Sequence, residues 1–248
     1  FHFSPSRAQA VLDEALAGFE GKLLCDGYSA YEGFVNKVNQ ADGDVTLCQC
    51  WSHTRRNFID AEKIEPVKVQ KVLLLLQKLY KVEDRARTMT PEERLALRQE
   101  HSKPAVEEFF EYLENDLAET ALLPSNPFVK AAEYAIARKV ELQVYLEDPN
   151  LQIDTNHVER ALRPQAVGRK NWMFHVTEVG ARHGAIFYSL IQSCILSGVD
   201  PTTYFIDVLQ RVDTHPASEV HLLTPRLWRE NFQDAPLKSL LDREPDSS

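Results

Sequence analysis

Short apolar segments separated by a helical pattern near the start of the chain constrain its fold most strongly. Residues 1–3 alternate apolar and polar side chains like the end of a strand, and residues 6–19 carry an apolar stripe at helical spacing. Residues 22–25 then form a short apolar strand, and residues 45–51 predict the next one after a short helix. The strand at residues 1–3, the helix at 6–19 and the strand at 22–25 predict an α/β crossover unit.

The strand predicted at residues 22–25 stops at Asp26-Gly27. Because α/β proteins often place functional groups at the carboxyl ends of strands, Asp26 is a candidate functional residue. An ordinary Asp-Gly turn is the slightly favoured interpretation of the dipeptide taken alone. The dipeptide alone therefore leaves both interpretations open.

A polar and basic segment follows the strand predicted at residues 45–51. Ser52 is a plausible N-cap for the next helix, and Cys50 and His53 have the Cys-x-x-His spacing of half a zinc site. Zinc usually needs four ligands and no second pair follows at a suitable spacing, so a buried thiol and a histidine at a helix start are the preferred interpretation. Arg55 and Arg56 could contact phosphate or face solvent, and the sequence does not decide between these roles.

Long helical periodicity covers residues 67–123, which we interpret as an all-helical insertion or arm, most of it solvated. Within it, Thr90-Pro91-Glu92-Glu93 is expected to open a helix with a capping box. Further helices are predicted over residues 127–146 and 185–196, and Asp200-Pro201 is expected to open another. The tail from residue 213 is rich in proline and charge, so we expect irregular packing and a disordered end.

Residues 154–174 concentrate acids and cations in about two helical turns and a turn region. Asn156 can cap a helix whose third residue is Glu159, so a capping-box role is one explanation of that acid. The alternative is a phosphate-handling site, because a local basic patch beside carboxylates suits a nucleic-acid backbone. The cations of this stretch are Arg160, Arg163, Arg169 and Lys170.

Composition limits the function classes. The 248 residues carry a net charge of −9, which argues against a general nucleic-acid coat protein but not against an enzyme whose DNA contacts are local. The four cysteines are too irregularly spaced for a disulfide framework, which favours a reducing cytosol. No apolar run is long enough to span a bilayer.

Paired carboxylates with neighbouring cations suit metal-dependent phosphoryl transfer. Asp26 and Glu159 are the candidate catalytic residues and metal ligands, with Asp154 a further candidate ligand. Oxygen ligands favour Mg²⁺ or Mn²⁺. Neither a Gly-x-Ser-x-Gly elbow nor a Gly-x-x-x-x-Gly-Lys loop is present, so a serine nucleophile or a P-loop is not predicted.

Several blocks, in this order, resemble the insertion sequence 66 family of transposases, and the resemblance spans about residues 3–212. The blocks are Leu24-Cys25-Asp26-Gly27-Tyr28-Ser29-Ala30-Tyr31, Cys50-Trp51-Ser52-His53-Thr54-Arg55-Arg56-Asn57-Phe58, Asp154-Thr155-Asn156-His157-Val158-Glu159-Arg160, Gly168-Arg169-Lys170-Asn171-Trp172-Met173-Phe174 and Gly198-Val199-Asp200-Pro201-Thr202-Thr203-Tyr204. One departure is Asp154-Thr155-Asn156, where the family usually carries Asp-Asn-Asn.

The resemblance implies an α/β fold with a ribonuclease-H-like core, a large all-helical insertion and a helical C-terminal region. It implies an Asp-Asp-Glu triad in which Asp26 matches the second acid and Glu159 the third. The family's first catalytic Asp lies on a strand upstream of the position that matches Phe1, and its DNA-recognition region also lies upstream. The implied chemistry is metal-dependent cleavage and strand transfer of DNA without a covalent protein intermediate.

The expected organisation follows from these assignments. Residues 1–66 would form the first part of the core, 67–123 the helical insertion, 124–212 the remainder of the core with the catalytic helix, and 213–248 a tail. The expected DNA-binding residues are Arg55, Arg56, Arg160, Arg163, Arg169 and Lys170.

The expected partners are DNA at the element ends and target, further copies of the same protein on DNA, and companion proteins of the element. A bacterial cytoplasmic location at the nucleoid is expected, with no membrane association. The alternatives are a transposase remnant that binds DNA or other subunits without cutting, and an unrelated α/β nuclease.

Overall fold

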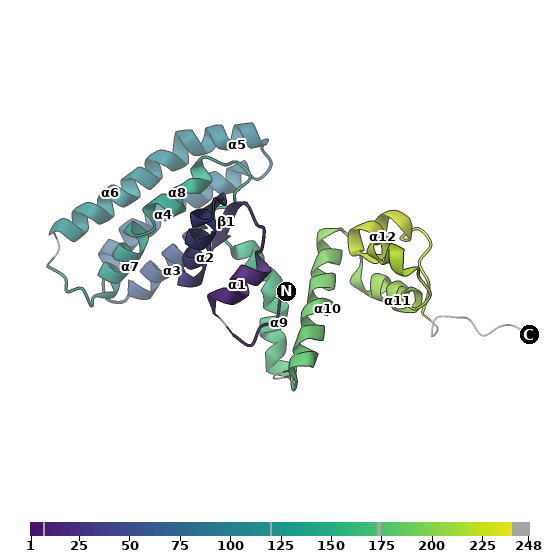
Figure 1. The fold of residues 1–248 in the computed structure, drawn as a ribbon. Helices are drawn as coiled ribbons and strands as arrows, with labels where there is room; N and C mark the ends of the chain where they lie inside the picture. Colours follow the sequence, from purple (N-terminus) through teal and green to yellow (C-terminus); the bar gives the residue numbers. More distant parts are fainter. Residues whose placement is uncertain (7, 120, 173–174, 240–248) are drawn as a thin grey trace, which may run out of the picture. The chain divides into compact units, whose positions relative to one another are not determined.

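The computed structural model describes the chain except residues 7, 120, 173–174 and 240–248, and it also leaves out the side chains of residues 169, 171 and 172. The described part is mostly helical and contains a small parallel sheet (Figure 1). It divides into two compact units: residues 7–160 form the first unit, and residues 1–6 with 161–248 form the second. Each unit is described by itself below.

The first unit begins with a strand–helix–strand crossover. β1 (Gly21–Cys25) and β2 (Val45–Gln49) pair in parallel, with Gly21 opposite Val45 and Cys25 opposite Gln49. α2 (Ser29–Gln40) connects the two strands, as a parallel pair requires. Phe34, Val35 and Val45 form a small core to which apolar residues of α1 (Gln9–Ala15) add. The crossover unit predicted over residues 1–25 was wrong, because residues 1–3 form no strand; the crossover joins β1 to β2 instead, the strands predicted at residues 22–25 and 45–51.

The remaining helices of the first unit build its main core. That core brings together residues far apart in sequence, including Trp51, Phe58, Phe109 and Phe128, which are 0% exposed. Its elements are α3 (Trp51–Ala61), α4 (Pro66–Ala86), α5 (Pro91–Leu97), the π-helical turn η1 (Arg98–Ser102), α6 (Lys103–Glu119), α7 (Pro127–Ile136), α8 (Lys139–Gln143) and η2 (Val144–Leu146).

The helical segment at residues 67–123 is therefore not a solvated arm, and that expectation was wrong. α4 and α6 each bury one apolar side against α3 and α7, as the full burial of Leu76 and Leu113 illustrates. Thr90 opens α5 with the predicted capping box: its hydroxyl accepts from the Glu93 amide, and the Glu93 carboxylate accepts from the Thr90 amide.

The second unit has its own core. Cys194, Val199, Tyr204 and Trp228 are buried together there. The elements of this unit are the C-terminal part of α9 (Asn156–Trp172), α10 (Glu178–Leu196), α11 (Pro201–Arg211), the 3-10 helix η3 (Ala217–Leu223) and α12 (Pro225–Asn231). Asp200 caps α11 as expected, because its carboxylate accepts hydrogen bonds from the Thr203 amide and hydroxyl.

Other sequence-based expectations need correction. Residues 1–3 form no strand; instead, the Phe1 amino group donates to the Ser189 hydroxyl at 2.8 Å and the Phe1 ring packs on Tyr188 of α10. The tail from residue 213 is not irregular up to residue 231, because η3 and α12 pack there through Trp228. The end predicted to be disordered lies outside the described residues.

The described cysteines and helices bear on two further expectations. All four cysteines are free and buried, so no disulfide joins them. Within the described ranges, no helix combines the length and the apolar character needed to cross a membrane.

Candidate functional site

The carboxyl ends of β1 and β2 define one edge of the sheet. Because Cys25 pairs with Gln49 in a parallel register, Asp26 and Cys50 each follow their strand at the same edge. α3 begins directly after Cys50, which brings the first turn of α3 to this edge as well. The prediction that Asp26 follows a strand end is confirmed.

Asp26 is half-buried and forms a local turn. Its Oδ1 atom accepts a hydrogen bond from the Tyr28 amide at 3.0 Å, which is the geometry of an Asx turn. Gly27 lies close to Tyr134: a Cβ atom at this position would be 2.2 Å from the Tyr134 hydroxyl, so a larger residue would displace that side chain. Burial, followed by the charge of Asp26, raises the pKa of Tyr31 above its ordinary value.

A cation that the sequence reasoning missed lies against this turn. Arg138 donates to the Gly27 carbonyl at 3.4 Å and stacks its guanidinium 3.9 Å from the centre of the Tyr134 ring. Burial raises the pKa of the Cys25 thiol to about 12; Asp26 adds to this shift and Arg138 opposes it. No local pattern marks Arg138, because it is 111 residues from the carbonyl that it contacts.

The start of α9 is tied to the start of α3. The Trp51 amide donates to the Ile153 carbonyl at 3.2 Å, and the amide and hydroxyl of Thr155 each contact the Cys50 sulfur at 3.2 Å. Cys50, not Ser52, is the N-cap residue of α3, so the Ser52 prediction was wrong. These contacts bring the segment before Glu159 to the edge of the sheet that carries Asp26.

Glu159 is not a capping-box residue. Its amide donates to the Thr155 carbonyl at 3.0 Å, which makes Thr155 the residue before the helix and places Asn156 inside it. The Glu159 carboxylate lies 3.4 Å from His53 Nε2 and 3.8 Å from the Arg56 guanidinium. The capping interpretation of Glu159 was therefore wrong, because the buried Thr155 takes the cap position and the carboxylate faces α3.

His53, half of the Cys-x-x-His pair, lies in the first turn of α3. Its Nδ1 atom is buried without a hydrogen-bond partner among the described residues, while Nε2 faces Glu159. The thiol of Cys50 is engaged by Thr155 and by the Ser52 hydroxyl at 3.0 Å. The two side chains of the Cys-x-x-His spacing thus have different neighbours.

Asp154 organises the first residue of α9. Its Oδ1 atom accepts from the Asn156 amide at 3.0 Å, and its Oδ2 atom accepts from the Asn156 side-chain amide at 2.6 Å. Burial and then the Asp154 charge raise the pKa of Tyr80 on α4. One explanation for Asp154 is therefore local support of the helix start.

Two hollows lie on either side of Tyr80 and Asn156, which line both. The first, of about 490 Å³, is bounded by α4, α5 and residues 152–160, and Arg160 is part of its lining. The second, of about 580 Å³, is lined by Arg55 and Arg56 of α3 and by α4, with no acidic residue among its lining residues. Arg55, Arg56 and Arg160 are exposed.

The other cations predicted to bind DNA are on α9 but in the second unit. Arg163 and Lys170 are exposed. The Arg169 side chain lies outside the described part of the chain. The segment predicted as a turn after residue 164 is helical, since α9 continues through Pro164 to Trp172.

The implied metal site is only partly matched by these side chains. Within the described residues, no group of three or more His, Cys, Asp or Glu side chains is arranged to hold a metal ion. Carboxylate oxygens are nevertheless the donors that Mg²⁺ and Mn²⁺ prefer, and Mg²⁺ keeps several waters when proteins bind it. Asp26 and Glu159 would therefore supply only part of such a shell.

The described residues define a broad class, that of a mostly helical protein with a two-stranded parallel sheet and with Asp26 at the carboxyl edge of that sheet. The comparison with family models makes this specific. Residues 1–183 match the model described as Transposase IS66 family, and residues 189–226 match the IS66 C-terminal element. The chain belongs to the IS66 family of transposases.

Relatives in Sinorhizobium fredii (strain NBRC 101917 / NGR234) agree with this membership. Uncharacterized protein y4qI is 35% identical over 230 residues, covering 91% of this chain and 42% of the relative. Uncharacterized protein y4hP is 30% identical over 243 residues, covering 92% of this chain and 43% of the relative. The chain thus spans less than half the length of these relatives. No solved structure matches it.

Proposed function

We propose that this chain is the catalytic part of a DNA transposase of the Asp-Asp-Glu type with a ribonuclease-H-like core. Asp26 is the second acid of the triad and Glu159 the third. The observation that carries the proposal is the tie between α3 and α9, because it brings Glu159 toward the sheet edge that Asp26 follows. Membership of the IS66 family supports the same reaction class.

The residues have distinct proposed roles. Asp26 and Glu159 hold Mg²⁺ or Mn²⁺, which when bound would stabilise the attacking and leaving oxygens of a phosphodiester. Asp154 is a further candidate ligand, although it already supports Asn156. We also propose that the remaining carboxylate comes from outside these 248 residues, as the family resemblance implies. Arg56 and His53 hold the Glu159 carboxylate in place when no metal is present.

DNA is the proposed substrate. The hollow that contains Arg55 and Arg56 lacks acidic lining residues, and the neighbouring hollow contains Arg160, so a phosphate backbone finds cations on both sides of Asn156. Arg163, Arg169 and Lys170 of the second unit are further proposed DNA-binding residues. We propose that several copies act together on DNA at the bacterial nucleoid, with companion proteins of the element as further partners.

One alternative has specific support. The described side chains form no group of three metal donors. The geometry of this chain therefore fits equally well a protein that binds DNA or other transposase subunits but does not cut DNA. This alternative predicts DNA binding without turnover in the intact gene product.

The deciding experiment measures metal-dependent nicking of labelled DNA by the intact gene product, on a plasmid carrying the sequences that flank the gene. We expect nicking with Mg²⁺ or Mn²⁺ and a loss of at least about 100-fold in Asp26→Asn and Glu159→Gln, because each removes a metal-positioning charge. Asp60→Asn and Glu107→Gln remove exposed carboxylates on α3 and α6 and serve as matched controls.

The outcomes separate the two functions. Full activity in Asp26→Asn or Glu159→Gln would overturn the site assignment. A wild-type protein that binds DNA but never nicks it, with either metal, would instead favour the non-cutting alternative.

A further inference from the structure

Arg98 is a buried arginine in an irregular turn of the helical segment. It opens η1, the π-helical turn between α5 and α6, and is 1% exposed. A buried cation carries a large desolvation cost unless it is fully paired, and π-helical turns often occur at functional positions. Both features suggest that Arg98 has a specific role.

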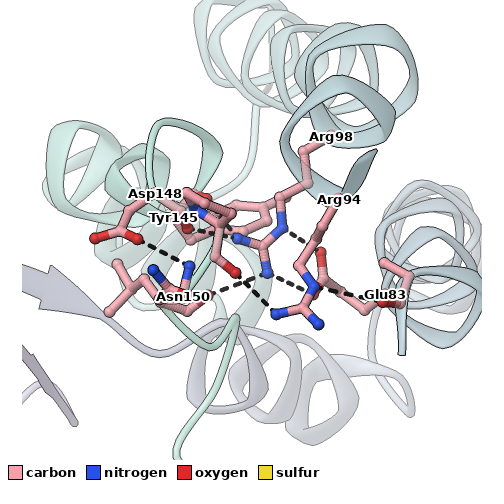
Figure 2. A network of polar contacts seen from close by, with 9 residues as sticks. Glu83, Arg94, Arg98, Tyr145, Asp148 and Asn150 are labelled. Carbon is pink, nitrogen blue, oxygen red and sulfur yellow. Dashed lines mark hydrogen bonds and ion pairs between the residues drawn. The ribbon is translucent and has the colours of Figure 1, made fainter. Parts of the chain in front are cut away.

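All five N–H groups of the guanidinium are satisfied (Figure 2). Two of them bind the Glu83 carboxylate of α4 in a bidentate pair, at 2.8 and 2.6 Å. The other three donate to the carbonyl groups of Tyr145, Asp148 and Leu151, at 2.8, 2.7 and 3.1 Å. More than half of its hydrogen bonds therefore go to one short stretch of backbone.

We call residues 145–151 the clamped segment. Neighbouring side chains hold it as well: Arg94 (Figure 2) donates to the Pro149 carbonyl at 2.9 Å. Lys22, at the start of β1, pairs with the Asp148 carboxylate at 2.7 Å. Gln99 donates to the Leu146 carbonyl at 2.8 Å. Contacts from α5, η1 and β1 thus meet on this segment.

The clamped segment leads directly into the candidate site. Two residues after Leu151, the Ile153 carbonyl accepts from the Trp51 amide, and Thr155 then contacts Cys50 and begins α9. Seven residues lie between Leu151 and Glu159, so we expect a displaced clamped segment to shift the start of α9 and, with it, the Glu159 carboxylate.

We propose that Arg98 is a positioning residue for Glu159, acting through the clamped segment. This inference rests on the proposed function, since it assigns Arg98 to the metal-binding role of Glu159. It gives the helical segment a part in the active site, because Arg98 and Glu83 both lie within that segment. Lysine cannot replace arginine here, since its ammonium has three donors and no planar fork.

The test is a double-mutant cycle on Mn²⁺ affinity, measured by calorimetry on the intact gene product. We expect Arg98→Lys to weaken Mn²⁺ binding by about tenfold to 100-fold, the range found when residues that orient metal ligands are replaced. In a Glu159→Gln background the same change should have no further effect. Arg87→Lys, which alters an exposed arginine paired with Asp84, is the matched control and should leave the affinity unchanged.

A purely structural role predicts a different result. If Arg98→Lys leaves Mn²⁺ affinity unchanged in the folded protein, or weakens it equally with and without Glu159, the positioning role is overturned. The milder variant Gln99→Ala releases one bond to the clamped segment and should follow the same pattern with a smaller loss, so the cycle can be completed even where Arg98→Lys does not fold.

Amide hydrogen exchange separates this inference from the proposed function. Faster exchange confined to residues 145–160 in Arg98→Lys, with α6 unchanged, is expected if the clamp holds the start of α9. If Glu159→Gln alone does not alter Mn²⁺ affinity, the proposed function fails, and a confined exchange change still supports the clamp. Uniformly faster exchange would overturn the clamp itself.

Discussion

Replacing Arg55 and Arg56 by alanine gives the sharpest measure of the proposed DNA path. Both side chains are exposed and line the hollow that has no acidic lining residue. Each phosphate contact releases about 0.9 counterion on duplex DNA, so removing two contacts should reduce the salt slope by about 1.8. When salt rises from 50 to 200 mM, the affinity of the double variant for DNA should therefore fall by a factor about 12-fold smaller than that of the wild type.

Fluorescence anisotropy of labelled duplex DNA at several salt concentrations measures this slope. The control is Lys103→Ala with Lys130→Ala, which removes two exposed cations from α6 and α7 and therefore changes the net charge equally. The control should keep the wild-type slope. If both double variants lose the same slope, the effect comes from net charge, and the proposed path along α3 and α4 is wrong.

Three further predictions concern stability and reactivity. Asp207→Asn should destabilise the second unit by about 3 to 5 kcal/mol at pH 7, since the buried carboxylate accepts four hydrogen bonds. Burial raises the pKa of Asp207, but its hydrogen bonds outweigh burial and lower this pKa overall. The stability difference between the wild type and Asp207→Asn, measured from denaturation curves, should therefore shrink as pH falls below about 4. A stability difference that does not change with pH would refute this. Iodoacetamide at pH 8 should label Cys25 and Cys48 only after unfolding, because burial raises their pKa values to about 12 and about 11; rapid native labelling would contradict this. Gly27→Ala should cost about 1 to 3 kcal/mol in denaturant titrations by displacing Tyr134, and an unchanged midpoint would refute the close approach.

Local patterns predicted the elements whose signals are local. The apolar run of β1 and the Asp-Gly stop after it predicted where Asp26 lies. The capping box at Thr90 and the Asp200 cap also depend on residues within three positions of each other, and both are present. Such features need no knowledge of the rest of the fold.

Features set by distant contacts were not predictable in this way. Trp51 was expected in a strand because it is apolar, but it opens α3, where its indole donates to the Leu142 carbonyl 91 residues away. Thr155 rather than Asn156 caps α9, because Cys50 holds Thr155 across 105 residues. Arg98 carries no local sequence signal, since its side-chain partner Glu83 is 15 residues away and its other partners are backbone carbonyls.

These long-range contacts make the position of Glu159 a property of the whole first unit. The acid is 133 residues from Asp26 in the sequence, and no strand pairing holds it near the sheet. Instead, the start of α9 is fixed by Cys50 and Trp51 of the α3 start and, through the clamped segment, by Arg98. α4 and α6 bury the apolar side of α3, and α4, α5 and η1 of the same helical segment supply Glu83, Arg94 and Arg98 to the clamp. The helical segment therefore cannot be shortened as if it were an accessory, because some of its residues close the core and others hold the clamped segment that leads to Glu159.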